Sequence, residues 1–286
     1  WIAEYRPDVR ETVIYDTAEP VFLPDTLTVL SWNVGYAGLG DDMDFFYDGG
    51  KRVRDSRRRT LENLRNIVAE LRKADADIML LQEVDCDSHR SYGIREVDSL
   101  RAAFPGYVLS FAYNYRAWVP IPLRSPMGRV GSGLVTLSRV VPLQAQRVQY
   151  PSAFPFPVRL FNLKRCLLAL QFRTAGGDTV LIGNTHNTAY DAGGMRDAEM
   201  RFLGGMPRAE SFRWSAATGI SIRPDIRLLR RNFPTNFSCL RRSIRRFSGR
   251  DSGSRTTIPR LRCVTWTLRG RRFRKTGNLG SGRRRR

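Results

Sequence analysis

The chain has 286 residues, of which 42% are hydrophobic, and a formal net charge of +21. This length suffices for one large α/β domain or two small ones, and the hydrophobic share is compatible with a sizeable core. The sequence contains no run of 18 apolar residues, so it predicts no membrane-spanning helix.

The predicted elements follow in chain order. Residues 1–25 are predicted to be an N-terminal extension. Leu61, Leu64, Val68 and Leu71 recur at helical spacing and predict a helix. Short apolar or β-branched runs bounded by Gly, Pro or charged residues predict strands. The predicted helices cover 57–72, 94–103 and 193–203, and the predicted strands cover 26–32, 77–81, 107–113, 133–137, 163–172 and 179–184. Loops are predicted at 38–54, which is rich in Gly and Asp, and at 118–127, which is rich in Pro. The alternation predicts an α/β or α+β layered fold.

The excess positive charge lies in the last third of the chain. Residues 204–286 hold 23 Lys and Arg against 3 Asp and Glu, whereas residues 1–203 hold 25 basic and 24 acidic side chains. The first part therefore has the composition of a neutral globular domain. The second part shows no sustained apolar period and is predicted to be disordered, since it cannot bury enough apolar surface to offset its ordering entropy.

Four cysteines stand at wide, irregular spacings: Cys86, Cys166, Cys239 and Cys263. No CxxC pair occurs, so a zinc site is not predicted and the redox compartment stays undecided. The first residue is Trp1 rather than Met, and we expect the sequence to be a fragment. The localisation is unknown at this point, and an upstream signal or membrane anchor stays open.

Three short motifs follow apolar runs that are predicted to be strands. They are SWNVG at 31–35, LQEVD at 81–85 and NTHN at 184–187, and they deliver Asn33, Glu83 and His186. Hydrolysis of a phosphate ester requires a hard cation with oxygen ligands, which suits Glu83. It also requires neutral or positive donors around the phosphate oxygens, which suits Asn33 and His186.

Each of these residues also has an ordinary structural explanation. A glutamate after a strand is most often a solvated loop residue, and an isolated histidine is more often structural than catalytic. Asparagine at a strand end is most often a turn former. Only the combination, in this order, favours phosphate chemistry.

The order SWN, LLQEVD, GSGLVTLSR (131–139) and IGNTHN resembles the endonuclease/exonuclease/phosphatase superfamily, with the deoxyribonuclease-I-like fold. The stretch 35–51 and the loop 119–128 resemble an uncharacterised bacterial branch of it. The resemblance covers residues 26–203. It implies a four-layer sandwich of two mixed β-sheets flanked by helices, incomplete at the C-terminus.

The resemblance also implies roles for individual residues. Glu83 would be the principal ligand of Mg²⁺ or Mn²⁺, and Asn33 would contact the metal or the phosphate. His186 would hydrogen-bond the scissile phosphate, with Asp191 as a helper, and Tyr115 would offer a hydroxyl on the phosphate side. Three other residues are expected to be peripheral: Asp85 in a supporting or loop-capping role, Arg139 in a structural or rim position, and His89 on the surface.

Two further family motifs, Gly-Asp-x-Asn and Ser-Asp-His, are missing. The last histidine of the chain is His186, so the usual Asp-His general base has no counterpart. Back-translation of residues 217–226, read one base earlier, yields Gly-Asp-Trp-Asn-Gln-Tyr-Pro-Pro-Gly-Tyr. The same offset turns residues 255–259 into Ser-Asp-His-Asn-Pro. We therefore hypothesise a single frame change between about residues 203 and 211, arising from a sequencing error, a pseudogene or a real truncation.

Two functional hypotheses follow. The first is a metal-dependent phosphoesterase, of nuclease or phosphatase type, that is inactive or impaired as written. Its substrate could be a nucleic acid, a lipid head group or a small molecule, and no obligate protein partner is inferred. The alternative is a non-catalytic basic protein that binds nucleic acid or an anionic membrane through its Arg-rich tail. A domain ending near residue 203 is also expected to have an unpaired sheet edge and poor solubility.

Overall fold

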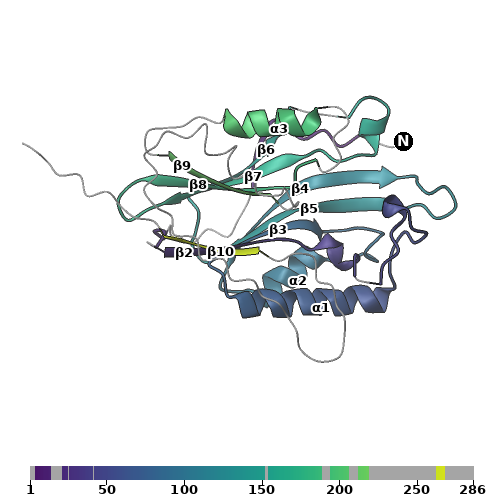
Figure 1. Ribbon diagram of the computed structural model, residues 1–286, viewed down its shortest axis with the longest axis horizontal. Helices are drawn as coiled ribbons and strands as arrows, with labels where there is room; N and C mark the ends of the chain where they lie inside the picture. The colour runs from purple at the N-terminus through teal and green to yellow at the C-terminus, as the bar shows by residue number, and fades with distance from the viewer. Residues whose placement is uncertain are drawn as a thin grey trace, which may run out of the picture.

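The computed structural model describes residues 4–13, 21–24, 26–40, 42–151, 154–188, 194–205, 212–218 and 262–267. Two five-stranded sheets face each other, with helices on their outer faces (Figure 1). The strands are β1 (Arg10–Thr12), β2 (Thr26–Asn33), β3 (Ile78–Asp85), β4 (Val108–Val119), β5 (Gly128–Ser138), β6 (Gln144–Gln149), β7 (Cys166–Arg173), β8 (Thr179–Thr185), β9 (Phe212–Thr218) and β10 (Arg262–Thr267). The helices are α1 (Arg57–Ala74), α2 (Glu96–Ala103) and α3 (Met195–Gly204), with 3-10 turns η1 (Gly35–Ala37), η2 (Phe46–Asp48) and η3 (Val158–Leu160).

Both sheets are mixed. One has the order β1-β6-β7-β8-β9, and the other has the order β10-β2-β3-β5-β4. The pairs β2–β3 and β8–β9 are parallel, and the remaining pairs are antiparallel. The predicted four-layer sandwich of two mixed sheets is confirmed. No helix in the described ranges is both long and apolar enough to cross a membrane.

The core alternates along the central strands. On β3, Ile78 and Leu80 face the second sheet, whereas Met79 and Leu81 face the helices. Because successive strand residues point to opposite faces, a strand that is covered on both sides must be apolar throughout. This explains why the short run 77–81 predicts a buried strand correctly.

Helices α1 and α2 cover the outer face of the sheet that contains β3, and α3 covers the other sheet (Figure 1). Leu64, Ile67 and Leu71 form the buried stripe of α1. The hydroxyl of Ser56 caps its first turn by accepting a hydrogen bond from the backbone N–H of Arg59 at 3.2 Å. The predicted helix therefore forms, and it extends two residues further than the periodicity indicates.

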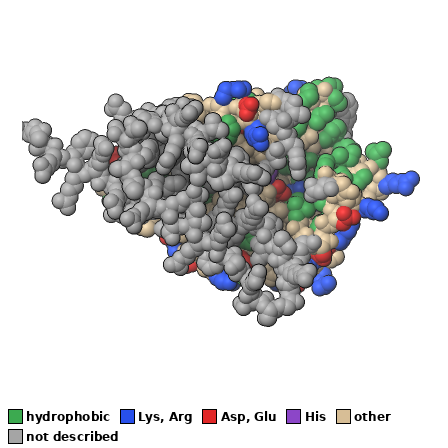
Figure 2. Space-filling view, viewed as in Figure 1, with side chains coloured by type: hydrophobic (Ala, Val, Ile, Leu, Met, Phe, Trp, Pro, Cys, Tyr) green, Lys and Arg blue, Asp and Glu red, His purple; other side chains and the backbone are tan. Residues whose placement is uncertain are grey.

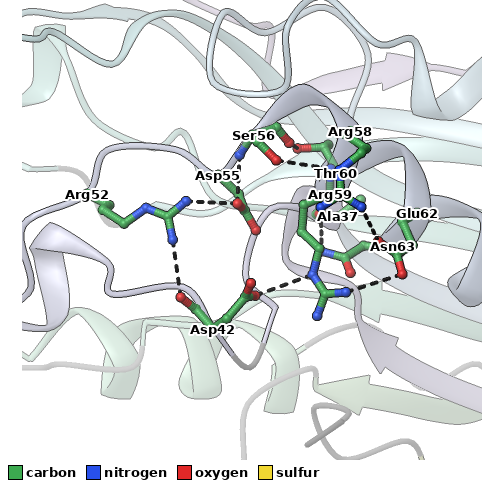
Figure 3. A network of polar contacts seen from close by, with 10 residues as sticks. All are labelled: Ala37, Asp42, Arg52, Asp55, Ser56, Arg58, Arg59, Thr60, Glu62 and Asn63. Carbon is green, nitrogen blue, oxygen red and sulfur yellow. Dashed lines mark hydrogen bonds and ion pairs between the residues drawn. The ribbon is translucent and has the colours of Figure 1, made fainter. Parts of the chain in front are cut away.

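The Gly- and Asp-rich loop before α1 is held by a polar network (Figure 3). Arg52 donates to the Asp55 carboxylate at 2.9 Å and to the backbone carbonyl of Asp42 at 3.2 Å. Arg59 reaches the Asp42 carboxylate at 3.4 Å, and Asn63 donates to the carbonyl of Ala37 at 2.9 Å. These contacts tie the chain that leaves β2 to the first turns of α1.

The sequence patterns miss strands at the margins of both sheets. Residues 10–12, expected in an extension, form β1 and pair with β6. Residues 212–218 and 262–267, expected in a disordered tail, form β9 and β10, which pair with β8 and β2. The edge of β8 that was expected to be unpaired therefore has a neighbour. Mixed polar sequence does not mark such strands, because edge strands need not be apolar on both faces.

Candidate functional site

Three side chains that are distant in the sequence meet where β2, β3 and β8 end. Asn33 donates from Nδ2 to Oε1 of Glu83 at 2.7 Å. The Nε2 atom of His186 lies 3.5 Å from the same oxygen. We call this group the Glu83 corner: Asn33, Glu83 and His186. The three strongest residues predicted from the sequence are thus brought together.

A β-bulge aims Glu83 into the corner. The register between β3 and β5 shifts between Leu81 and Val84, and Glu83 has φ +56°. This left-handed backbone is uncommon for a residue with a side chain and costs about 1–2 kcal/mol. Opposite the bulge stands Gly133, where a Cβ atom would lie 2.1 Å from the carbonyl of Ala112. Such strain persists where a side-chain direction is needed, which makes Glu83 a functional candidate.

A polar contact between the sheets sets the distance between Glu83 and His186. Gln82, next to Glu83, donates to the Asn184 side-chain oxygen at 2.8 Å. Asn184 in turn donates to the backbone carbonyls of Leu81 and Val135 at 3.1 and 2.9 Å. Both side chains are fully buried, so leaving either one unpaired would be costly. Gln82 and Asn184, which belong to the same motifs as Glu83 and His186, therefore hold the two sheets in register.

His186 is neutral at pH 7. It is 5% exposed, and burial lowers its pKa to about 4, although the nearby Glu83 carboxylate opposes that shift. The contact with Glu83 is therefore a polar contact of an uncharged imidazole and not an ion pair. Its Nδ1 atom is buried and has no hydrogen-bond partner among the described residues. A neutral imidazole has one N–H, so His186 can donate one hydrogen bond, and its second ring nitrogen can only accept.

Arg165 lies beside the corner and is missed by the sequence patterns. It donates from Nη1 to the backbone carbonyl of His186 at 2.5 Å. Its Nε is buried without a partner, and no carboxylate in the described ranges comes within ion-pair distance. Burial lowers the pKa of Arg165, although the charges of Glu199 and Glu83 oppose the shift. A part-buried guanidinium without a counter-ion favours the approach of an anion.

Asp85 forms a buried ion pair with Arg90, which lies in the loop that follows β3. Arg90 binds both oxygens of Asp85, at 3.1 and 2.8 Å, and its guanidinium lies 3.6 Å from the centre of the Tyr36 ring. Burial works against the charge of Arg90, but the pairing with Asp85 outweighs it and raises the pKa of Arg90. The carboxyl of Glu96 accepts the backbone N–H of Asp85 at 2.9 Å. This group fixes the strand end just beyond Glu83.

The remaining candidates lie away from these contacts. Tyr115 donates its hydroxyl to the backbone carbonyl of Phe161 at 2.8 Å, and burial raises its pKa, so the phenol is engaged and protonated. Arg139 pairs with Asp75 and Asp77, in keeping with a structural role. His89 is exposed, as expected. Asp191 and most of the segments that the frame-change hypothesis concerns, residues 219–226 and 255–259, lie outside the described residues.

The donors of the corner suit a hard divalent cation in part. Oε1 of Glu83 is held by Asn33, while Oε2 has no hydrogen bond among the described residues. The side-chain oxygen of Asn33 accepts the backbone N–H of Gly35 at 3.0 Å and keeps one lone pair. No group of three His, Cys, Asp or Glu side chains gathers in the described ranges. Mg²⁺ commonly takes one or two carboxylates and completes its shell with water and substrate phosphate, so this donor set fits.

The comparisons with known proteins identify the family. The model of the Endonuclease/Exonuclease/phosphatase family matches residues 30–258. This match spans most of the chain and runs beyond residue 203, where the sequence resemblance was expected to end. The chain belongs to this family, whose members hydrolyse phosphate esters. A search of curated proteins finds no match.

Several solved structures are similar to the chain. An endonuclease/exonuclease/phosphatase from Beutenbergia cavernae shares 23% identity over 63% of this chain and 42% of that one, with a TM-score of 0.43. A humanized TDP2 from D. rerio shares 14% identity over 85% of this chain and 99% of that one, with a TM-score of 0.49. ANGEL2, a 2',3'-cyclic phosphatase, shares 20% identity over 62% and 44%, with a TM-score of 0.38. The chain thus spans less than half of the bacterial structure.

Proposed function

We propose that this chain carries the metal-binding half of a divalent-metal-dependent phosphoesterase centre, with Glu83 as the metal ligand. The observation that supports the proposal best is the convergence of Asn33 and His186 on one oxygen of a glutamate held in left-handed backbone. The substrate is a phosphate ester, and the chemistry of the corner does not select among nucleic acid, lipid head group and small molecule.

Each residue has a separate task in this proposal. Glu83 presents its free Oε2 to Mg²⁺ or Mn²⁺, and Asn33 orients that carboxylate through Oε1. His186, neutral and buried, hydrogen-bonds a phosphate oxygen through a ring nitrogen. Arg165 neutralises part of the phosphate charge from the side of the His186 carbonyl. When bound, the metal would supply Lewis-acid polarisation of the phosphate and a lower pKa for the attacking water.

We further propose that hydrolysis by this chain is impaired. The Gly-Asp-x-Asn and Ser-Asp-His motifs are missing from the sequence, and with them the Asp-His pair that would deprotonate water. General-base catalysis contributes about 10²–10⁴-fold to such reactions. Metal binding at Glu83 should therefore persist in a chain whose turnover is low.

The first experiment measures metal binding. Isothermal titration of the full chain with Mn²⁺ should give one site, and Glu83→Gln should lose it. Glu62→Gln, an equal change at an exposed position of α1, should leave binding unaltered. Equal affinities in the native chain and in Glu83→Gln would contradict the role of Glu83.

The second experiment tests the loss of the general base. Resequencing the gene comes first, because an uninterrupted frame without the two motifs removes the frame-change hypothesis. A chain rewritten in the alternative frame from about residue 204 should then hydrolyse bis(p-nitrophenyl) phosphate with Mn²⁺ at least a hundredfold faster than the present chain. Glu83→Gln in the rewritten chain should abolish that gain, and equal rates in both chains would overturn the proposal.

A further inference from the structure

Exposed apolar side chains gather at the far end of β4 and β5. In the loop that joins these strands Leu123 is 87% exposed and Ile121 41%, and Trp118, near the end of β4, is 43% exposed. Figure 2 shows hydrophobic side chains collected at the right-hand end of the molecule, with Lys and Arg and a few Asp or Glu side chains at their margin. We call residues 116–131 the hairpin tip. Large apolar side chains clustered in this way on a folded domain indicate an interaction surface.

The exposure is a property of an ordered hairpin. Strands β4 and β5 stay paired out to Val119 and Gly128, and Met127 donates its N–H to the carbonyl of Ile121 at 3.0 Å. Val119, Met127 and Val130 form a small buried core beneath the tip. The tip thus has a buried set of apolar residues and an exposed set. The hairpin backbone directs the exposed set, Trp118, Ile121 and Leu123, into solvent.

The charge of the hairpin tip has one sign. The segment contains Arg116, Arg124 and Arg129 and no Asp or Glu. Arg129 pairs with Asp87 at 2.7 Å, and Arg116 lies over the rings of Tyr5 and Tyr113. Arg124 is exposed and has no carboxylate within ion-pair distance in the described part of the chain. The tip therefore combines aliphatic side chains with guanidinium groups that suit phosphate.

The order of these groups along the hairpin matches the polarity of a bilayer surface. Leu123 and Ile121 lie in the terminal loop together with Arg124, whose long side chain can reach back toward the headgroups. Trp118 lies opposite Arg129, and Arg116 lies opposite Gly131, nearer the domain. Aliphatic groups suit the acyl region, tryptophan suits the interface, and arginine suits the headgroups. An open groove of about 750 Å³ at the base of the hairpin is lined by three arginines, Arg6, Arg116 and Arg129, and by two carboxylates, Glu4 and Asp87, so its charge is mixed with a basic excess. It lies at headgroup level in this arrangement.

A second apolar projection lies beside the base of the hairpin. Phe156 is 71% exposed, and Val158 is also exposed, at η3. The chain that follows them runs against β4, where Lys164 donates its backbone N–H to the carbonyl of Asn114 at 2.8 Å. Arg159 follows Val158, lies 6.0 Å from the centre of the Phe156 ring and pairs with Glu4 at 3.5 Å. Two apolar projections with basic neighbours at one end of the molecule favour an extended anionic surface over a small ligand.

We propose that the hairpin tip docks this protein onto the surface of a lipid bilayer that contains anionic phospholipids. Single-stranded nucleic acid is a poorer match, because the most exposed side chain of the tip, Leu123, is aliphatic, and Trp118 is a single ring on which a base could stack rather than a series of them. The hairpin extends about 13 Å beyond Ser132, the last β5 residue paired with β3, at the strand end that carries Glu83. Docking would therefore turn the Glu83 corner toward the headgroups. The inference stands whether or not the corner hydrolyses phosphate.

The test is vesicle binding by the full chain. Co-sedimentation would use vesicles of phosphatidylcholine with and without phosphatidylserine, at about 0.5 M salt, where the Arg-rich tail is screened. Ile121→Ser combined with Leu123→Ser leaves every charge and the tail unchanged. We expect this double variant to lose at least tenfold in partition coefficient. The matched control is Val21→Ser with Phe22→Ser, an exposed apolar pair elsewhere, which should keep native binding.

Two further measurements keep the test decisive. At about 0.1 M salt, where an exposed charge is less screened, Arg124→Gln should reduce the preference for phosphatidylserine over pure phosphatidylcholine relative to the native chain, which carries the same tail. Brominated lipid should quench the tryptophan fluorescence of the native protein more than that of Trp118→Phe. This difference reports the position of the tip even if the double variant folds poorly. Equal vesicle binding by the native chain and the double variant would overturn the proposal. So would a double variant that loses binding to a single-stranded oligonucleotide or an acidic peptide while keeping its vesicle binding.

Discussion

Folded proteins usually bury apolar side chains and expose charged ones, and the Glu83 corner and the hairpin tip depart from this rule in opposite directions. The corner brings a buried, neutral histidine and a bulged glutamate together, and Arg165 lies beside it with no carboxylate at ion-pair distance among the described residues. The tip leaves a leucine and an isoleucine in solvent at the end of a well-paired hairpin. Neither arrangement is what folding stability alone would select, so each marks a place where the chain meets something else.

The two regions differ in how firmly the rest of the fold depends on them. The corner is built into the sandwich, because the Gln82–Asn184 contact and the Asp85–Arg90 pair lie next to the candidate residues. The tip projects from the sandwich, and the small core beneath it packs against Phe45, Phe46 and Val53 of the chain before α1. Substitutions in the corner should therefore change stability and function together, whereas substitutions at the tip should change binding alone.

The largest expected effect comes from breaking the pair behind the corner. Asp85→Ala leaves the buried guanidinium of Arg90 without its counter-ion, and we expect a loss of about 3–5 kcal/mol in the free energy of unfolding. Urea denaturation measures it. Asp87→Ala, which breaks the more exposed pair with Arg129, should cost about 1 kcal/mol or less. Similar losses of unfolding free energy in both variants would show that the fold depends on the pair behind the corner no more than on a surface pair.

A pH dependence should follow from Glu96, which supports the same strand end. Burial, followed by the charge of Asp85, raises the pKa of Glu96 well above its usual range. The folded protein then holds a proton that the unfolded chain releases, so this contribution to stability is full below about pH 4.5 and is lost as the pH rises. Glu96→Gln should be more stable than the native chain at pH 8 and should show a flatter profile between pH 5 and 8. An unchanged profile in denaturation experiments would contradict this.

A smaller effect should expose the strain at the bulge. Glu83→Ala and Glu83→Gly both remove the carboxylate and should both lose Mn²⁺ binding. Because residue 83 has φ +56°, we expect the glycine variant to be more stable than the alanine variant by about 1 kcal/mol. In an ordinary strand the order is reversed by about 0.5–1 kcal/mol. Thermal denaturation of the two variants gives the sign directly, and alanine as the more stable one would remove the argument from strain.

The smallest effect on stability should come from the tip. Ile121→Ser and Leu123→Ser replace exposed side chains, so their free energies of unfolding should lie within about 0.5 kcal/mol of the native value. The same denaturation assay measures this, with Val130→Ser, in the small core beneath them, as the contrast. A large loss at Leu123 would mean that the tip is part of the core, and the comparison between the two regions would fail.

The sequence predicted the layered fold and the central elements because their signals are local. Strands β3 and β8 contain the apolar runs 78–81 and 180–182, and α1 has a clear apolar stripe, so these patterns locate them well. The strands near the sheet margins were not predicted, and the reason is physical. The strand β6, with the sequence QAQRVQ, reads as polar, yet its Arg147 is buried and bonded to backbone carbonyls. No local pattern indicates that a cation will be enclosed by distant chain.

By itself, the sequence determined which residues could hold a metal and a phosphate, because oxygen and nitrogen donors at strand ends are visible in the motifs around Asn33, Glu83 and His186. Only the tertiary structure decided that they meet, since Glu83 and His186 are 103 positions apart and are brought together by a bulge and by a contact between sheets. The tertiary structure also decided that Arg165 has no carboxylate at ion-pair distance among the described residues, and that the loop at the hairpin tip stays in solvent. Pairing and exposure depend on the neighbours that folding supplies, and those neighbours are not adjacent in the chain.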